Sequence, residues 1–71
     1  MPLRIHLSEL LGRQRMKQSE LAELTGMRRA TINAIYHERI KRFEVDQIES
    51  ICKALDCQPG DLMTYDKGEG Q

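Results

Sequence analysis

The 71-residue sequence contains no tryptophan, only three aromatic residues, two cysteines and no long hydrophobic run. A membrane-spanning helix needs about 20 consecutive apolar residues, and a signal peptide needs an apolar stretch that residues 1–4 do not provide. We therefore expect a cytoplasmic protein with Cys52 and Cys57 reduced and unpaired. From this length we expect a single domain and no second, catalytic one. The same length allows one small core of marginal stability, which self-association would strengthen.

The residues that bind metals or carry out catalysis are also scarce. Cys52 and Cys57 are separated by four residues, no second pair follows at zinc-site spacing, and His6 and His37 are isolated. Neither thiol has the local signature of a base held by a third group, and the chain has no phosphate-binding glycine loop or recognisable carboxylate pair. We expect no metal, no cofactor and no enzymatic activity, with both thiols packed in the core.

The formal net charge of zero argues at first against binding to a polyanion. The charges are nevertheless unevenly distributed. Residues 1–45 contain nine Lys and Arg against five Asp and Glu, an excess of four positive charges, whereas residues 46–71 contain two against six, an excess of four negative charges. This asymmetry predicts that one surface meets a polyanion and that the acidic surface lies elsewhere.

Hydrophobic periodicity predicts an all-α chain, in keeping with 39% hydrophobic and 31% charged residues. The predicted helices are Leu7 to Arg15, Gln18 to Thr25, Arg28 to His37, Val45 to Leu55, and Pro59 to Met63. Alternation at Leu3 and Ile5 predicts a short strand that pairs with the C-terminal end or with another copy of the chain. Residues 1–65 form the single predicted domain, and the Gly-rich residues 66–71 form a predicted disordered tail.

The apolar positions of these helices define the predicted core. The second helix carries Leu21, Ala22 and Leu24. The full stripe of the fourth helix consists of Val45, Ile48, Ile51, Cys52 and Leu55. The fifth helix is expected to pack on the core through Leu62. The three aromatic residues, Tyr36, Phe43 and Tyr65, are interpreted as packing or interface residues.

The segment from Gln18 to Ile35 has the pattern of two helices that cross steeply through a tight turn. Such a unit needs a small residue at the crossing, a glycine at the turn and apolar residues beneath. Ala22 meets the first requirement and Gly26 the second. The apolar set consists of Leu21, Met27, Ile32 and Ile35.

With these residues the chain resembles the Cro/cI-type (Xre-like) helix-turn-helix family from about Leu7 to Met63. The stretch from Ile51 to Leu62 resembles the end of its small stand-alone members. The resemblance implies a compact five-helix, lambda-repressor-like DNA-binding domain. Lys17 and Arg28 depart from the family, which usually has Ser or Thr at both positions. Each change removes a side-chain helix cap worth about 1 kcal/mol but adds positive charge beside the expected DNA surface.

The helix predicted from Arg28 to His37 has two faces. A step of 100° per residue turns Ile32 and Ile35 inward and several short side chains outward. The resemblance implies that the start of this helix lies in the major groove, where Arg bonds guanine, Asn bonds adenine and an alanine methyl contacts thymine. The predicted base-reading residues are Arg28, Arg29, Ala30, Asn33, Ala34 and His37, although His37 could equally be a solvated helix end.

Phosphate contacts are expected on both sides of this helix, where they would set register rather than sequence preference. The predicted phosphate-binding residues are Lys17, Gln18, Thr31, Arg39, Lys41 and Arg42.

Together these features predict a homodimeric transcriptional repressor that binds double-stranded DNA at a two-fold symmetric operator, with reading helices about 34 Å apart. The last helix, the termini or Phe43 would join the protomers. The alternative is a protein-interaction module, antitoxin-like or an accessory subunit, that uses the acidic fourth and fifth helices to bind a partner protein.

Overall fold

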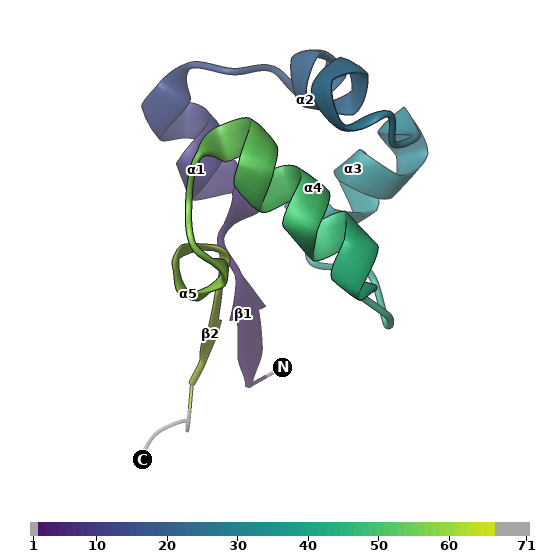
Figure 1. Cartoon of the computed structure of the whole chain (residues 1–71). Helices are drawn as coiled ribbons and strands as arrows, with labels where there is room; N and C mark the ends of the chain where they lie inside the picture. Colours follow the sequence, from purple (N-terminus) through teal and green to yellow (C-terminus); the bar gives the residue numbers. More distant parts are fainter. Residues whose placement is uncertain (1, 67–71) are drawn as a thin grey trace.

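Five short helices and two short strands make up the computed structural model of the chain, which describes residues 2–66 (Figure 1). The elements in chain order are β1 (Leu3–Ile5), α1 (Leu7–Gln14), α2 (Gln18–Thr25), α3 (Arg29–Tyr36), α4 (Val45–Leu55), α5 (Pro59–Leu62) and β2 (Met63–Tyr65). The five predicted helices are confirmed in order and type. In the described residues, no helix combines the length and the apolar character needed to cross a membrane.

Several predicted boundaries move by one residue for local backbone reasons. α1 ends at Gln14 because Arg15 adopts a left-handed conformation with φ of 53°. Arg28 and His37 cap α3 instead of lying within it. The prediction that the last helix includes Met63 was wrong, because Met63 has extended backbone, with φ of −135° and ψ of 142°, and starts β2.

The N-terminal strand pairs with the C-terminal end of the same chain, which settles the alternative left open by the sequence. β1 and β2 run antiparallel, with Leu3 opposite Tyr65, Arg4 opposite Thr64, and Ile5 opposite Met63. The His6 N–H donates to the Leu62 carbonyl oxygen at 2.7 Å. At the far end, the N–H of Asp66, the first residue of the predicted tail, donates to the Pro2 carbonyl oxygen at 2.6 Å. Residues 67–71 of that tail lie outside the described residues.

The core lies where the helices converge above the sheet. Its buried residues are Ile5, Leu7, Leu10, Leu11, Leu21, Ala22, Ile32, Ile35, Ile51, Leu55 and Leu62. Two predicted apolar positions are instead solvent-exposed. Leu24 is 61% exposed because its position on α2 is rotated about 60° from Leu21, away from Ala22. Val45 is 70% exposed and is the first residue of α4, at the end of the helix stripe.

Both cysteines are free thiols that lie at the margin of the core rather than inside it. Cys52 and Cys57 are each half-buried against core residues. Burial, together with the neighbouring Cys52, raises the pKa of Cys57 to about 11. Cys57 is therefore a protonated, weakly nucleophilic thiol near neutral pH, in keeping with a packing role.

Gly26 makes the turn between α2 and α3. Its φ is +73°, a left-handed conformation that costs a residue with a side chain about 1 to 2 kcal/mol. Its N–H donates to the Ala22 carbonyl oxygen at 2.9 Å and closes the last turn of α2. This glycine confirms the turn predicted from the sequence.

Substituting Gly26 tests this backbone requirement against a matched position. An added Cβ meets no atom within 4 Å at Gly26 or at Gly12, which lies inside α1. We expect Gly26→Ala to lower the free energy of unfolding by about 1 to 2 kcal/mol, and Gly12→Ala to raise it by about 0.5 to 1 kcal/mol. Urea unfolding followed by circular dichroism measures both values. Equal effects of the two substitutions would contradict a left-handed turn.

Candidate nucleic-acid interface

α2, the turn at Gly26 and α3 form one rigid unit. The Thr25 hydroxyl donates to the Leu21 carbonyl oxygen at 2.8 Å and accepts the Met27 N–H at 3.2 Å, so the turn is bonded on both sides. Leu21, Ile32 and Ile35 are completely buried and hold the two helices together. The orientation of α3 is therefore fixed by packing before any ligand binds.

The outer side of α3 carries the predicted base-reading residues. With Ile32 and Ile35 buried, the inward half of the sequence prediction is confirmed. Arg28, Arg29, Ala30 and His37 are exposed, whereas Thr31, Asn33 and Ala34 are half-buried. The exposed residues lie at the two ends of the helix, with short side chains between them. This face is narrow enough to approach another surface closely.

The first turns of α2 and α3 have N–H groups that no side-chain cap satisfies. Lys17 and Arg28 occupy the two N-cap positions, and neither side chain can accept a hydrogen bond. At α2 the Glu20 carboxylate accepts only the N–H of Lys17 itself, at 2.8 Å. Within residues 2–66, both helix starts therefore present N–H donors without an acceptor beside a cationic side chain, an arrangement that attracts phosphate oxygens.

A surface hollow of about 460 Å³ lies between the end of α1, the start of α2 and α3. Its lining includes four predicted site residues: Lys17, Gln18, Arg29 and Asn33. The rest of the lining is Ser8, Leu11, Gly12, Met16, Ser19 and Tyr36. No carboxylate is among these ten residues, so the hollow combines two cations with neutral donors. It suits an anion rather than a metal or a cationic ligand.

Asn33 is bonded at both ends of its side-chain amide to other residues of the chain. Its Nδ2 donates to Gln18 Oε1 at 3.2 Å, and its Oδ1 accepts a bond from a terminal nitrogen of Arg39 at 2.6 Å. These bonds connect α3 to the start of α2 and to the loop that follows α3. The sequence prediction of an outward-facing Asn33 did not include either partner.

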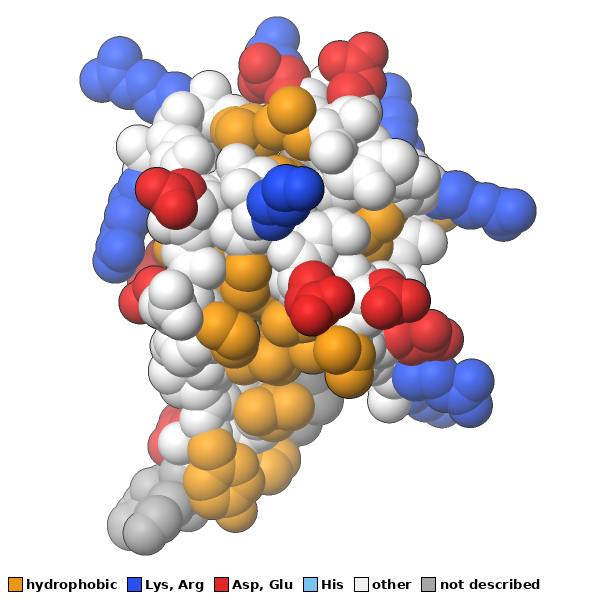
Figure 2. Space-filling model, viewed as in Figure 1, with side chains coloured by type: hydrophobic (Ala, Val, Ile, Leu, Met, Phe, Trp, Pro, Cys, Tyr) orange, Lys and Arg blue, Asp and Glu red, His pale blue; other side chains and the backbone are white. Residues whose placement is uncertain are grey.

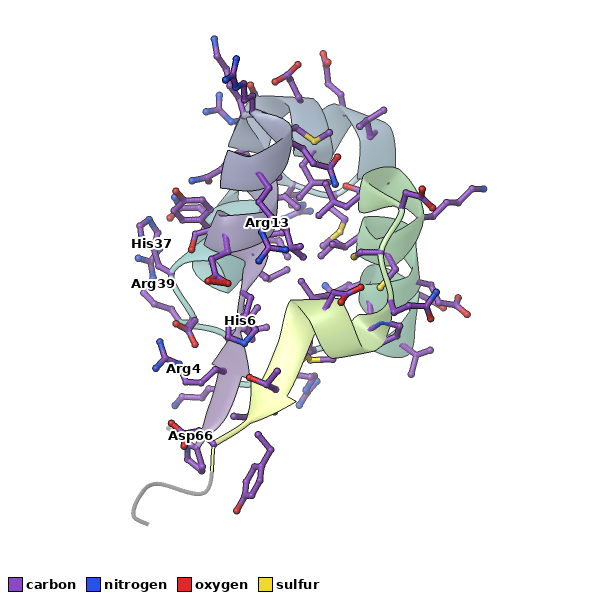
Figure 3. All side chains as sticks on the ribbon, turned by 90° about the vertical axis from the view of Figure 1, so that its left-hand side faces the viewer. Arg4, His6, Arg13, His37, Arg39 and Asp66 are labelled. Atoms are coloured by element: carbon purple, nitrogen blue, oxygen red, sulfur yellow. The ribbon has the colours of Figure 1, made fainter. Side chains whose placement is uncertain are left out.

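A second network joins the same loop to the sheet. The Arg4 guanidinium donates two hydrogen bonds to the Glu38 carboxylate, each at 2.9 Å, and the Ile5 N–H donates to it at 3.0 Å. These donors lower the pKa of Glu38 to about 2, with the Arg4 hydrogen bond as the main cause and the Ile5 N–H next. Figure 3 shows His37, Arg39 and Arg4 following one another along one side of the molecule.

The structure separates the predicted phosphate-binding residues into two groups. Lys17 and Gln18 line the hollow beside α3, and Arg39 reaches it through Asn33. Lys41 and Arg42 are exposed but line a different, mostly apolar hollow of about 350 Å³ next to the sheet. Thr31 stays half-buried on the flank of α3.

Sequence reasoning missed Ser8, Ser19 and Tyr36 as lining residues, and it missed the Arg4–Glu38 pair. Glu38 is the one acidic residue among the basic side chains that follow α3, which is a weak sign of a specific partner. Its partner Arg4 is 34 residues away and is brought near only by the sheet.

The fold and this surface define a helix-turn-helix protein with an anion-attracting face. A family model for the Cro/C1-type helix-turn-helix DNA-binding domain matches residues 6–68, and the chain belongs to this family. The chain is also similar to the uncharacterized HTH-type transcriptional regulator YozG of Bacillus subtilis (strain 168). The two are 33% identical over 69 residues, covering 97% of this chain and 82% of that protein.

The Glu38 network predicts a defined loss of stability in acid. Because folding lowers the pKa of Glu38 from 4.5 to about 2, its ionised form stabilises the fold above pH 4.5, and this contribution is lost as the pH falls toward 2. We expect Glu38→Gln to melt at a lower temperature than the wild type at pH 7, with the difference disappearing near pH 2. Thermal unfolding at several pH values tests this.

Glu49→Gln is the control, because Glu49 is exposed and forms no ion pair within residues 2–66. If both variants followed the wild-type pH profile, the Glu38 contacts would contribute nothing to stability.

Proposed function

We propose that this protein is a small transcriptional regulator, acting as a repressor, that binds double-stranded DNA with α3 in the major groove. The observation that supports this most directly is the shared surface of α2 and α3. Two uncapped helix starts and the cations Lys17 and Arg29 border one hollow whose lining contains no carboxylate, and Arg28 lies next to Arg29 as the N-cap residue of α3. The similarity to a protein named as a transcriptional regulator supports the regulatory role. A DNA-binding role also supports a cytoplasmic location for the protein.

In this proposal the residues of α3 share the reading of bases. Arg28 and Arg29 enter the groove first and donate to guanine O6 and N7. Ala30 and Ala34 bring methyl groups to thymine, and His37 reads at the other end of the helix. Within residues 2–66, the side chains of Arg28 and Arg29 form no ion pair or hydrogen bond, so both are available to DNA.

The phosphate contacts lie on either side of this helix. Lys17, Gln18 and the first N–H groups of α2 bind one strand, and the loop cations bind the other. Arg39, Lys41 and Arg42 are all exposed and follow α3 directly. These contacts fix the position of α3 along the groove and contribute affinity for any sequence.

We further propose that the active form is a homodimer joined through the sheet. Leu3 and Tyr65 stand opposite each other on one face, at 43% and 68% exposed, and Ile40 and Phe43 extend this face around the 350 Å³ hollow. Figure 2 shows hydrophobic side chains gathered below α4 and continuing over the strands. In the described chain β2 pairs only with β1, so its outer edge is open. A two-fold axis at that edge would pair β2 antiparallel with its own copy.

Two substitutions test the division between base reading and phosphate binding. Duplexes are first selected from a random pool by the wild-type protein, which also reports operator symmetry and spacing. We expect Arg29→Ala to weaken binding to a selected duplex by about 1 to 3 kcal/mol and to relax preference at one base pair. Lys41→Ala should weaken binding to all duplexes alike. It should also reduce the slope of log binding constant against log salt concentration by about one, because one phosphate contact is lost.

Both effects are measured by fluorescence anisotropy at several salt concentrations. Binding that ignored salt and survived both substitutions would contradict the proposal. A protein that retained a stoichiometric protein partner from its own cells, without DNA, would favour the alternative of a protein-interaction module.

The dimer proposal has its own test. We expect Tyr65→Glu to convert the protein from dimer to monomer, because the two new carboxylates and the two Asp66 side chains would bring four negative charges together at the two-fold axis. Light scattering after size exclusion measures the mass. Glu23→Gln, on the exposed side of α2, is the control. A monomeric wild type, or a dimeric Tyr65→Glu, would contradict an interface at the sheet.

A further inference from the structure

Gln18, Asn33 and Arg39 form a hydrogen-bonded relay that connects three separate elements. Arg39 donates to Asn33 Oδ1 at 2.6 Å, and Asn33 Nδ2 donates to Gln18 Oε1 at 3.2 Å. Gln18 is the first residue of α2, Asn33 lies in the middle of α3, and Arg39 lies in the following loop. The relay therefore joins Gln18 and Arg39, both predicted to bind phosphate, through a residue predicted to read a base.

The relay leaves donors at both of its ends. Because Gln18 Oε1 accepts the Asn33 bond, the Nε2 of Gln18 faces the other way, and within residues 2–66 it donates to nothing. Arg39 uses one of its five N–H groups on Asn33. The Arg39 backbone is also fixed, because its N–H donates to the Ala34 carbonyl oxygen at 2.8 Å. Two donor groups are thus held in place on either side of α3.

The charge of Arg39 remains uncompensated although an acid precedes it in sequence. Glu38 gives its carboxylate to Arg4 and to the Ile5 N–H. Within residues 2–66 Arg39 takes part in no ion pair. The neutral Asn33 amide orients the guanidinium without cancelling its charge, which leaves the charge for an anion.

We propose that Asn33 is a positioning residue, which holds Gln18 and Arg39 in the orientation where both donate to backbone phosphates of one bound duplex. This inference rests on the proposed function. It leaves the reading of bases to the other residues of this face, Arg28, Arg29, Ala30, Ala34 and His37. Bidentate reading of adenine would require both ends of the Asn33 amide to face one base edge, whereas other elements of the chain hold both ends.

The relay is tested with Asn33→Ala, Arg39→Ala and the double variant, each shown to be folded by its thermal unfolding curve. The probes are a duplex that the wild type selects from a random pool and a set of its single-base-pair variants. We expect each single substitution to weaken binding about tenfold, as expected for one charge-assisted hydrogen bond. The double variant should lose little more than either single one, because the two residues act as one unit.

The salt dependence separates positioning from base reading. Asn33 is uncharged, yet Asn33→Ala should reduce the slope of log binding constant against log salt concentration by about one. The reason is that Arg39 loses the hydrogen bond that orients it toward a phosphate. Discrimination among the single-base-pair variants should stay unchanged. Arg42→Ala is the control. Arg42 is a loop cation outside the relay, and its effect should add to that of Asn33→Ala.

Three results would overturn the relay: a loss of discrimination at one base pair in Asn33→Ala, an unchanged salt slope in that variant, or full additivity with Arg39→Ala. A wild-type protein that selects no duplex would instead overturn the proposed function, and the phosphate role of the relay with it.

Discussion

The close packing of α2 against α3 across Gly26 determines most of what this protein presents to a partner. The left-handed conformation at Gly26 ends α2 and starts the turn into α3, and burial of Leu21, Ile32 and Ile35 holds the two helices together. With these residues inward, the starts of both helices and the outer face of α3 have one possible placement. The hollow and the exposed position of Arg29 follow from that constraint.

Charge is arranged around this unit by pairing as well as by position. Glu38 lies within the basic segment but is occupied by Arg4 and the Ile5 N–H, so the local acid stabilises the fold instead of neutralising the loop. Within the described residues, the Arg39 side chain hydrogen-bonds only to the neutral amide of Asn33. A chain with zero net charge can thus retain a positively charged surface. The excess of acidic residues lies in residues 46–71, outside α2 and α3.

The periodicity of apolar residues was sufficient to predict the five helices, the turn glycine and the inward face of α3, because burial on one helix face repeats at a regular spacing. β2 could not be found in this way. Three residues are too few for a period, and Met63 lies in a strand that pairs with residues almost 60 positions earlier in the chain, with Ile5 opposite it. The exposure of Val45 depends on where the core ends, which helix spacing does not reveal.

The candidate site was predictable to the level of residue type and face. Arg28 and Arg29 are exposed, as the sequence indicates, because burying an unpaired charge beside a turn would be costly. The hydrogen bonds of Asn33 were not predictable, because they depend on the distance from α3 to Gln18 and on the path of the loop after it. Such contacts between elements exist only once the fold is formed.

The most direct test of the account is the map of backbone amide chemical-shift changes when a selected duplex is titrated into the isotope-labelled protein. The account predicts changes concentrated at residues 17–19, 28–34 and 37–42, with α4 and α5 little affected. Changes concentrated on α4 and α5 instead, with α3 unchanged, would contradict the central claim that α2 and α3 form the DNA-binding surface.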